Sequence, residues 1–78
     1  MNTTDRTSVV LFVDDDPAIL SALRRDLRHE PYEVVTLTTP NEALQCVEER
    51  PVNLIVTDLR MPEMDGLELL REVRRRSP

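Results

Sequence analysis

The sequence has no lysine and no tryptophan, one glycine, one cysteine and only two aromatic residues, Phe12 and Tyr32. A lone cysteine, Cys46, cannot form an intramolecular disulfide and excludes a zinc site built from several cysteines. No apolar run is long enough to span a membrane, and the run that starts at Val9 turns acidic too soon for a secretion signal. We therefore expect a cytoplasmic protein without a membrane partner, whose core is aliphatic.

Net charge and chain length further restrict which kinds of protein this can be. The formal net charge is −5 and all ten basic residues are arginine, so the chain lacks the basic face that nucleic-acid binding requires. A chain of 78 residues forms one small domain, which buries about 60 % of its unfolded surface. We expect residues 1–7 to be a flexible polar tail and residues 8–78 to fold.

Short apolar segments rich in β-branched residues alternate with amphipathic ones. The predicted strands cover residues 8–13, 33–38 and 54–56, and the predicted helices cover residues 17–28, 40–50 and 66–75. Asp16, Thr39 and Asp65 stand at the helix starts as caps. This βαβαβα order indicates an α/β fold with a parallel sheet and right-handed crossovers. With strand order 2-1-3, a crevice opens at the carboxyl ends of the first and third strands.

Carboxylates follow the two strands that border this crevice. Asp14, Asp15 and Asp16 come directly after the first strand, and Asp58 comes after the third. Carboxylates that share a crevice repel one another unless a cation neutralises them. Oxygen ligands without a histidine or cysteine suit Mg²⁺ or Mn²⁺, which retain waters and take further oxygens from a phosphate. A carboxylate beside such an ion can act as a nucleophile and form an aspartyl phosphate.

Two segments carry a resemblance to a known family. The run Phe12-Val-Asp-Asp-Asp-Pro17 resembles the acidic pair of response-regulator receiver domains of bacterial two-component signalling, and the run Thr57-Asp-Leu-Arg-Met-Pro-Glu-Met-Asp-Gly66 resembles their phosphoacceptor segment. The resemblance implies a flavodoxin-like receiver fold, truncated here to its first three βα units. It also implies a signalling module rather than an enzyme, phosphorylated by a histidine kinase or a phosphotransfer protein.

The resemblance assigns roles to single residues. Asp58 matches the phosphoacceptor, Asp14 and Asp15 match the metal-binding pair, and the backbone carbonyl of Arg60 matches a further metal ligand. Three later residues match positions that shape the loop: Pro62, Asp65 and Gly66. Family members continue with a strand that ends in a switch serine or threonine and another that ends in a lysine. Without them we expect impaired phosphotransfer, and an apolar third-strand edge through which copies of the chain associate.

Several alternatives stay open at this point. The chain could be an interaction module that works without phosphorylation, or an inert fragment. A metal-dependent phosphohydrolase would use two acids at the spacing of Asp14 and Asp16, but Pro17 and Ala18 follow where a glycine turn is needed. The acids could also do no more than cap helices and turns.

Overall fold

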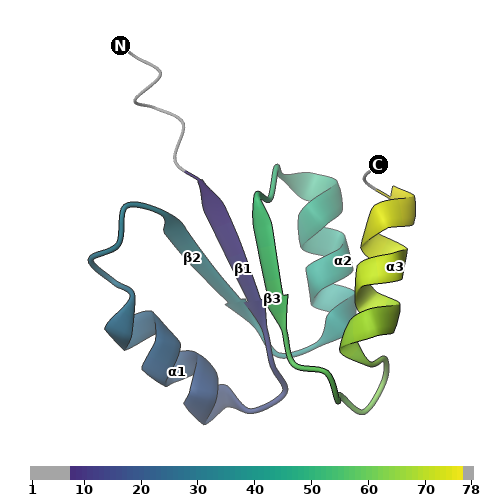
Figure 1. Ribbon diagram of the computed structural model, residues 1–78, viewed down its shortest axis with the longest axis horizontal. Helices are drawn as coiled ribbons and strands as arrows, with labels where there is room; N and C mark the ends of the chain where they lie inside the picture. Colours follow the sequence, from purple (N-terminus) through teal and green to yellow (C-terminus); the bar gives the residue numbers. More distant parts are fainter. Residues whose placement is uncertain (1–7, 77–78) are drawn as a thin grey trace.

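The computed structural model describes residues 8–76, so the predicted tail over residues 1–7 lies outside the described residues (Figure 1). Six elements follow one another in the predicted order: β1 (Val9–Val13), α1 (Pro17–Asp26), β2 (Glu33–Leu37), α2 (Pro40–Glu49), β3 (Leu54–Thr57) and α3 (Gly66–Arg76). The helix boundaries agree with the prediction to within two residues. Within residues 8–76, no helix has the length and apolarity needed to cross a membrane.

The strands form a parallel sheet in the predicted order, β2-β1-β3. β1 is the central strand, and all five of its residues are buried. α1 lies on one face of the sheet, and α2 and α3 lie side by side on the other (Figure 1). β2 and β3 are both edge strands of the described sheet.

Alternate side chains of β1 enter two separate apolar clusters. Leu11 and Val13 point toward α2 and α3, where they pack with Ala43, Leu44 and the fully buried Leu69. Val10 and Phe12 point to the other face, where they form a second apolar cluster with Leu20 of α1. A continuous apolar strand is thus explained by helices on both faces of the sheet.

Side chains cap all three helices as the sequence predicts. The Asp16 carboxylate accepts a hydrogen bond from the Ala18 N–H at 2.9 Å, and the Thr39 hydroxyl accepts one from the Glu42 N–H at 3.2 Å. At the start of α3, the Asp65 carboxylate accepts from the Glu68 N–H at 2.8 Å. The Glu68 carboxylate accepts from the Asp65 N–H at 3.0 Å, which completes a reciprocal capping box.

Two polar contacts between residues far apart in the sequence stabilise the end of the sheet at which the three strands begin. The Asn53 side-chain oxygen accepts a hydrogen bond from the Val9 N–H at 2.7 Å, which ties the residue before β3 to the start of β1. Arg50, after α2, donates two hydrogen bonds to Glu33 of β2, at 2.7 and 3.1 Å. This contact lowers the pKa of Glu33, mainly through the hydrogen bond, and raises the pKa of Arg50.

Candidate functional site

The strand register places Asp14 and Asp58 next to each other. Val13 is paired with Thr57 across β1 and β3, so the residues that follow them leave the sheet at the same edge. The Asp58 N–H donates to the Val13 carbonyl at 3.0 Å, and the Asp14 N–H donates to the Leu37 carbonyl at 3.1 Å. Backbone hydrogen bonds to neighbouring strands therefore fix the positions of both residues. The predicted crevice lies here, at the carboxyl ends of β1 and β3.

Three carboxylates converge in this crevice. Asp14, Asp15 and Asp58 each offer an oxygen, and these atoms all lie within 4.8 Å of one another. The Asp14 carboxylate also accepts a hydrogen bond from the Asp16 N–H at 2.9 Å, which orients it. A set of oxygen ligands that is open to solvent suits a hard divalent cation that keeps part of its water shell. The residues present therefore fit Mg²⁺ or Mn²⁺, and a cation would offset their mutual repulsion.

The other predicted residues lie around these carboxylates. Asp16 caps α1 and is not one of the three carboxylates that converge. Arg60 and Pro62 are exposed residues of the connection between β3 and α3. Asp65 caps α3, as described above. The role of the Arg60 carbonyl as a metal ligand stays a prediction.

Gly66 is required for a different reason than turn geometry. Gly66 is the first residue of α3 and has a negative φ, and no residue in the described part of the chain has a positive φ. Its backbone conformation therefore does not require glycine. A Cβ added there would overlap the carbonyl oxygen of Asp58 and would lie 3.1 Å from Cγ2 of Thr57. The Gly66 N–H also donates to the Leu59 carbonyl at 2.9 Å. The missing side chain thus lets the start of α3 pack against the backbone of Asp58.

Two residues without an assigned role from the sequence support the site. Met61 is 8 % exposed and joins the core cluster, so it anchors the loop between β3 and α3. The connection also holds Leu59 and Met64, so the sequence alone does not single out Met61 as the buried residue. The Thr57 hydroxyl donates to the Asp58 carbonyl at 3.0 Å, a local contact that the sequence pattern does not reveal.

A cavity of about 150 Å³ adjoins the carboxylates on the α1 face of the sheet. Asp14 and Asp58 form its polar end, whereas Leu20 and Leu23 of α1 and Val56 of β3 form its apolar part. The acidic crevice therefore opens onto an apolar recess. One side of the acidic crevice is therefore apolar.

The chain is similar in sequence to known transcriptional regulatory proteins. The chain is 42 % identical over 69 residues to the transcriptional regulatory protein GlrR of Escherichia coli K12, a match that covers 88 % of this chain and 16 % of the relative. It is 39 % identical over 67 residues to the transcriptional regulatory protein KdpE of Mycobacterium tuberculosis H37Rv, covering 86 % of this chain and 30 % of the relative. The chain therefore spans less than a third of the length of either protein.

Solved structures agree with these similarities. The signal receiver domain of an HD domain-containing protein from Pseudomonas fluorescens Pf-5 matches with a TM-score of 0.86 and 32 % identity, over 94 % of this chain and 58 % of that one. The chemotaxis protein CheY4 of Vibrio cholerae matches with a TM-score of 0.85 and 33 % identity, over 92 % of this chain and 60 % of that one. The family described as the response regulator receiver domain matches residues 10–78. By fold, by sequence and by its paired acidic segments, this chain belongs to the response regulator receiver domain family.

Proposed function

We propose that this chain is a phosphoacceptor receiver, in which Asp58 takes a phosphoryl group from a phosphohistidine of a histidine kinase or a phosphotransfer protein. One observation carries the proposal: carboxylates from two adjacent strand ends, Asp14 and Asp15 on one side and Asp58 on the other, bring oxygens to within 4.8 Å of one another. Such a cluster is unfavourable in a small domain unless a cation is bound. Bound Mg²⁺ or Mn²⁺ would supply positive charge that screens an incoming phosphoryl group from these acids.

The residues of the chain have separate tasks in the transfer. Asp14, Asp15, Asp58 and the Arg60 carbonyl would hold the cation. A carboxylate oxygen of Asp58 attacks phosphorus, the P–N bond of the phosphohistidine breaks, and its electron pair stays on the imidazole, which takes up a proton. The new P–O bond belongs to an acyl phosphate. The backbone bonds of Asp58 to β1 and its contact with Gly66 position the attacking group.

The proposal also covers the character of the module. The chain promotes its own phosphorylation and dephosphorylation and acts on no other substrate. With a formal charge of −5 it works without nucleic-acid contact through this segment, in the cytoplasm. Three carboxylates surround the position of the incoming phosphoryl group, so we expect transfer that depends strictly on the divalent cation.

Intact-mass measurement tests this function. The chain is incubated with a small-molecule phosphodonor, with and without Mg²⁺, next to Asp58→Asn and to the control Asp26→Asn, which changes an exposed carboxylate at the end of α1. We expect the mass of one phosphoryl group in the wild type and the control, only with Mg²⁺, and none in Asp58→Asn. Equal phosphorylation of Asp58→Asn would refute the assignment.

A further inference from the structure

The start of α3 carries a dipeptide, Asp65-Gly66, that is chemically reactive in peptides. Gly66 is the only glycine of the chain, and Asp65 is the only aspartate that a glycine follows. A glycine leaves the amide nitrogen after the aspartate unhindered, and its flexible backbone lets the aspartate side chain reach that nitrogen. Asp65-Gly66 is therefore the pair at which this chain forms a cyclic imide most readily.

The fold requires both residues of this pair, for unrelated reasons. Asp65 caps α3 through its carboxylate, which accepts a hydrogen bond from the Glu68 N–H at 2.8 Å. Gly66 lacks a side chain at a position where a Cβ would overlap the carbonyl oxygen of Asp58. Replacing either residue would lose the cap or the close contact with Asp58. The reactive pair is thus built into the connection that leads from β3 to α3.

Four hydrogen bonds hold the pair away from the geometry in which it reacts. Cyclisation requires the Gly66 nitrogen to attack the side-chain carbonyl carbon of Asp65. The N–H of Gly66 instead donates to the Leu59 carbonyl at 2.9 Å. The Asp65 carboxylate is held by the Glu68 N–H, the Asp65 N–H by the Glu68 carboxylate at 3.0 Å, and the Asp65 carbonyl by the Leu69 N–H at 3.0 Å. Neither reacting group is free to turn toward the other.

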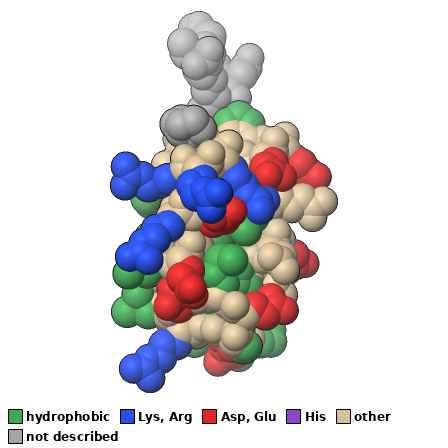
Figure 2. Space-filling view, turned by 90° about the vertical axis from the view of Figure 1, so that its right-hand side faces the viewer, with side chains coloured by type: hydrophobic (Ala, Val, Ile, Leu, Met, Phe, Trp, Pro, Cys, Tyr) green, Lys and Arg blue, Asp and Glu red, His purple; other side chains and the backbone are tan. Residues whose placement is uncertain are grey.

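The capping box formed by Asp65 and Glu68 lies at the surface. Both residues are exposed. Figure 2 views the side of the molecule that carries α3, and its lower part, toward the start of this helix, shows acidic side chains that face solvent. Solvent-exposed hydrogen bonds in a terminal turn open more readily than buried ones. Water, which the hydrolysis of an imide consumes, also reaches this site.

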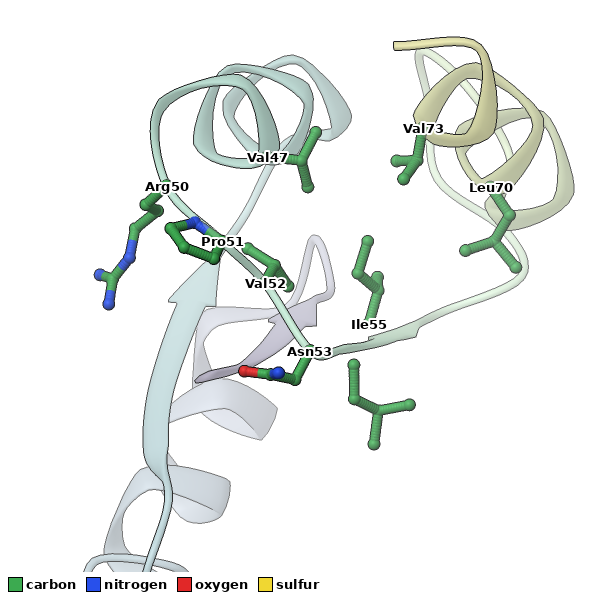
Figure 3. Close-up of a pocket in the computed structure, with 9 residues that line it drawn as sticks. Val47, Arg50, Pro51, Val52, Asn53, Ile55, Leu70 and Val73 are labelled. Atoms are coloured by element: carbon green, nitrogen blue, oxygen red, sulfur yellow. The ribbon is translucent and has the colours of Figure 1, made fainter. Parts of the chain in front are cut away.

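Apolar contacts fix the chain on both sides of the pair. Met61 before it and Leu69 after it are buried. Figure 3 shows the next turns of α3, where Leu70 and Val73 are turned toward Ile55 of β3. The first turn of α3 depends on polar contacts, whereas the following turns are held by apolar ones. The first turn can therefore open while the rest of the helix stays in place.

We propose that Asp65-Gly66 is a site of spontaneous covalent modification, at which opening of the first turn of α3 permits isomerisation of Asp65 to isoaspartate and the capping box suppresses it. In the open state the Gly66 nitrogen bonds to the side-chain carbon of protonated Asp65, and the amide hydrogen and the carboxyl hydroxyl leave as water. A second water then opens the imide ring at one of its two carbonyl groups. One product is aspartate, and the other is isoaspartate.

Isoaspartate at position 65 cannot restore the native contacts. Its main chain is longer by one methylene, and the former side-chain carboxyl group becomes the link to Gly66. The bond from the capping carboxylate to the Glu68 N–H is lost, and Gly66 moves relative to the Asp58 carbonyl oxygen, with which it is in close contact. The modified chain therefore has a weakened start of α3.

Uptake of heavy oxygen from water tests the proposal in the full chain. The wild type is incubated at neutral pH in heavy-oxygen water, folded or in urea, and its peptides are mapped by chromatography and mass spectrometry. Each cycle of imide formation and hydrolysis places one heavy oxygen at Asp65. Asp58, which is followed by Leu59, serves as the internal reference. We expect label at Asp65 in both states, at a rate at least about tenfold lower in the folded chain.

The variants Glu68→Ala and Glu68→Gln test the capping box. Alanine removes the acceptor for the Asp65 N–H, whereas glutamine keeps a side-chain oxygen for this bond and removes the charge. With native helical circular dichroism in each case, we expect Glu68→Ala to take up label about two- to tenfold faster than the wild type and Glu68→Gln to match the wild type. In urea all three chains should react at one rate, because the reactive pair is the same.

Each contrary result overturns the proposal. A folded wild type that takes up label as fast as the chain in urea would show that the fold gives no protection. More label at Asp58 than at Asp65 would place the reactive site elsewhere. If Glu68→Ala reacts no faster than the wild type, the capping box does not control the reaction. If Glu68→Gln reacts as fast as Glu68→Ala, or if the chains differ in urea, the charge of Glu68 sets the rate and the hydrogen bond does not.

Discussion

Replacing Gly66 by alanine tests how the start of α3 supports the phosphoacceptor. Alanine is the better helix former, which favours the variant by about 1 kcal/mol. The added Cβ would overlap the Asp58 carbonyl oxygen and would lie 3.2 Å from the Cα of Leu59. These neighbours are backbone atoms and cannot rotate away, so the upper end of the overpacking cost, about 3 kcal/mol, applies. We expect a net loss of about 2 kcal/mol in the free energy of unfolding.

Thermal unfolding followed by circular dichroism measures this loss. In a domain of this size each kcal/mol changes the melting temperature by about 4–8 °C, so Gly66→Ala should melt roughly 8–16 °C below the wild type. Arg71→Ala is the matched control, because Arg71 is an exposed residue in the middle of α3 and forms no ion pair within residues 8–76. A Gly66→Ala variant as stable as the wild type would refute the reasoning, since the connection after β3 would then yield to the new side chain.

Three further perturbations follow from described contacts. Asp15→Asn removes one repelling charge from the crevice, so the variant should be more stable than the wild type without Mg²⁺ and should gain less from it in a thermal shift titration. Leu69→Ala empties a fully buried position and should cost about 2–5 kcal/mol in urea unfolding, whereas a loss below 1 kcal/mol would contradict the described core. The Arg50 hydrogen bond lowers the pKa of Glu33, so its stabilisation is complete above the unfolded pKa of about 4.3 and disappears as the pH falls through the lower folded value. In the Glu33→Gln variant the free energy of unfolding should therefore fall less steeply as the pH is lowered. An unchanged fall would show that the contact between Glu33 and Arg50 does not contribute to stability.

Local patterns predicted most of the fold. The apolar run of β1 predicted a strand buried on both faces, and the caps at Asp16, Thr39 and Asp65 predicted the helix starts, because each of these signals lies within a few residues of the structure it specifies. The strand order 2-1-3 came from the likeness to flavodoxin-like folds, and the structure confirms it. The register that brings Asp58 beside Asp14 then completed the predicted cluster.

The remaining features depend on contacts between distant parts of the chain. The hydrogen bond from the Val9 N–H to Asn53 joins residues 44 positions apart, and the pair of Arg50 and Glu33 joins a helix end to a strand. No sequence period encodes such partners. The need for Gly66 likewise comes from the backbone of Asp58, which approaches it only once β3 and α3 have packed.

The central position of β1 also affects when the acidic cluster forms during folding. Asp14 follows β1 and Asp58 follows β3, and α1, β2 and α2 separate these two strands in the sequence, so the two carboxylates meet only when β3 pairs with β1. Contacts that form after the rate-limiting barrier change unfolding rates and leave folding rates unchanged. We therefore expect bound Mg²⁺ to lower the unfolding rate of the protein and to leave its folding rate unchanged. The ion would stabilise the completed sheet and would take no part in nucleating it.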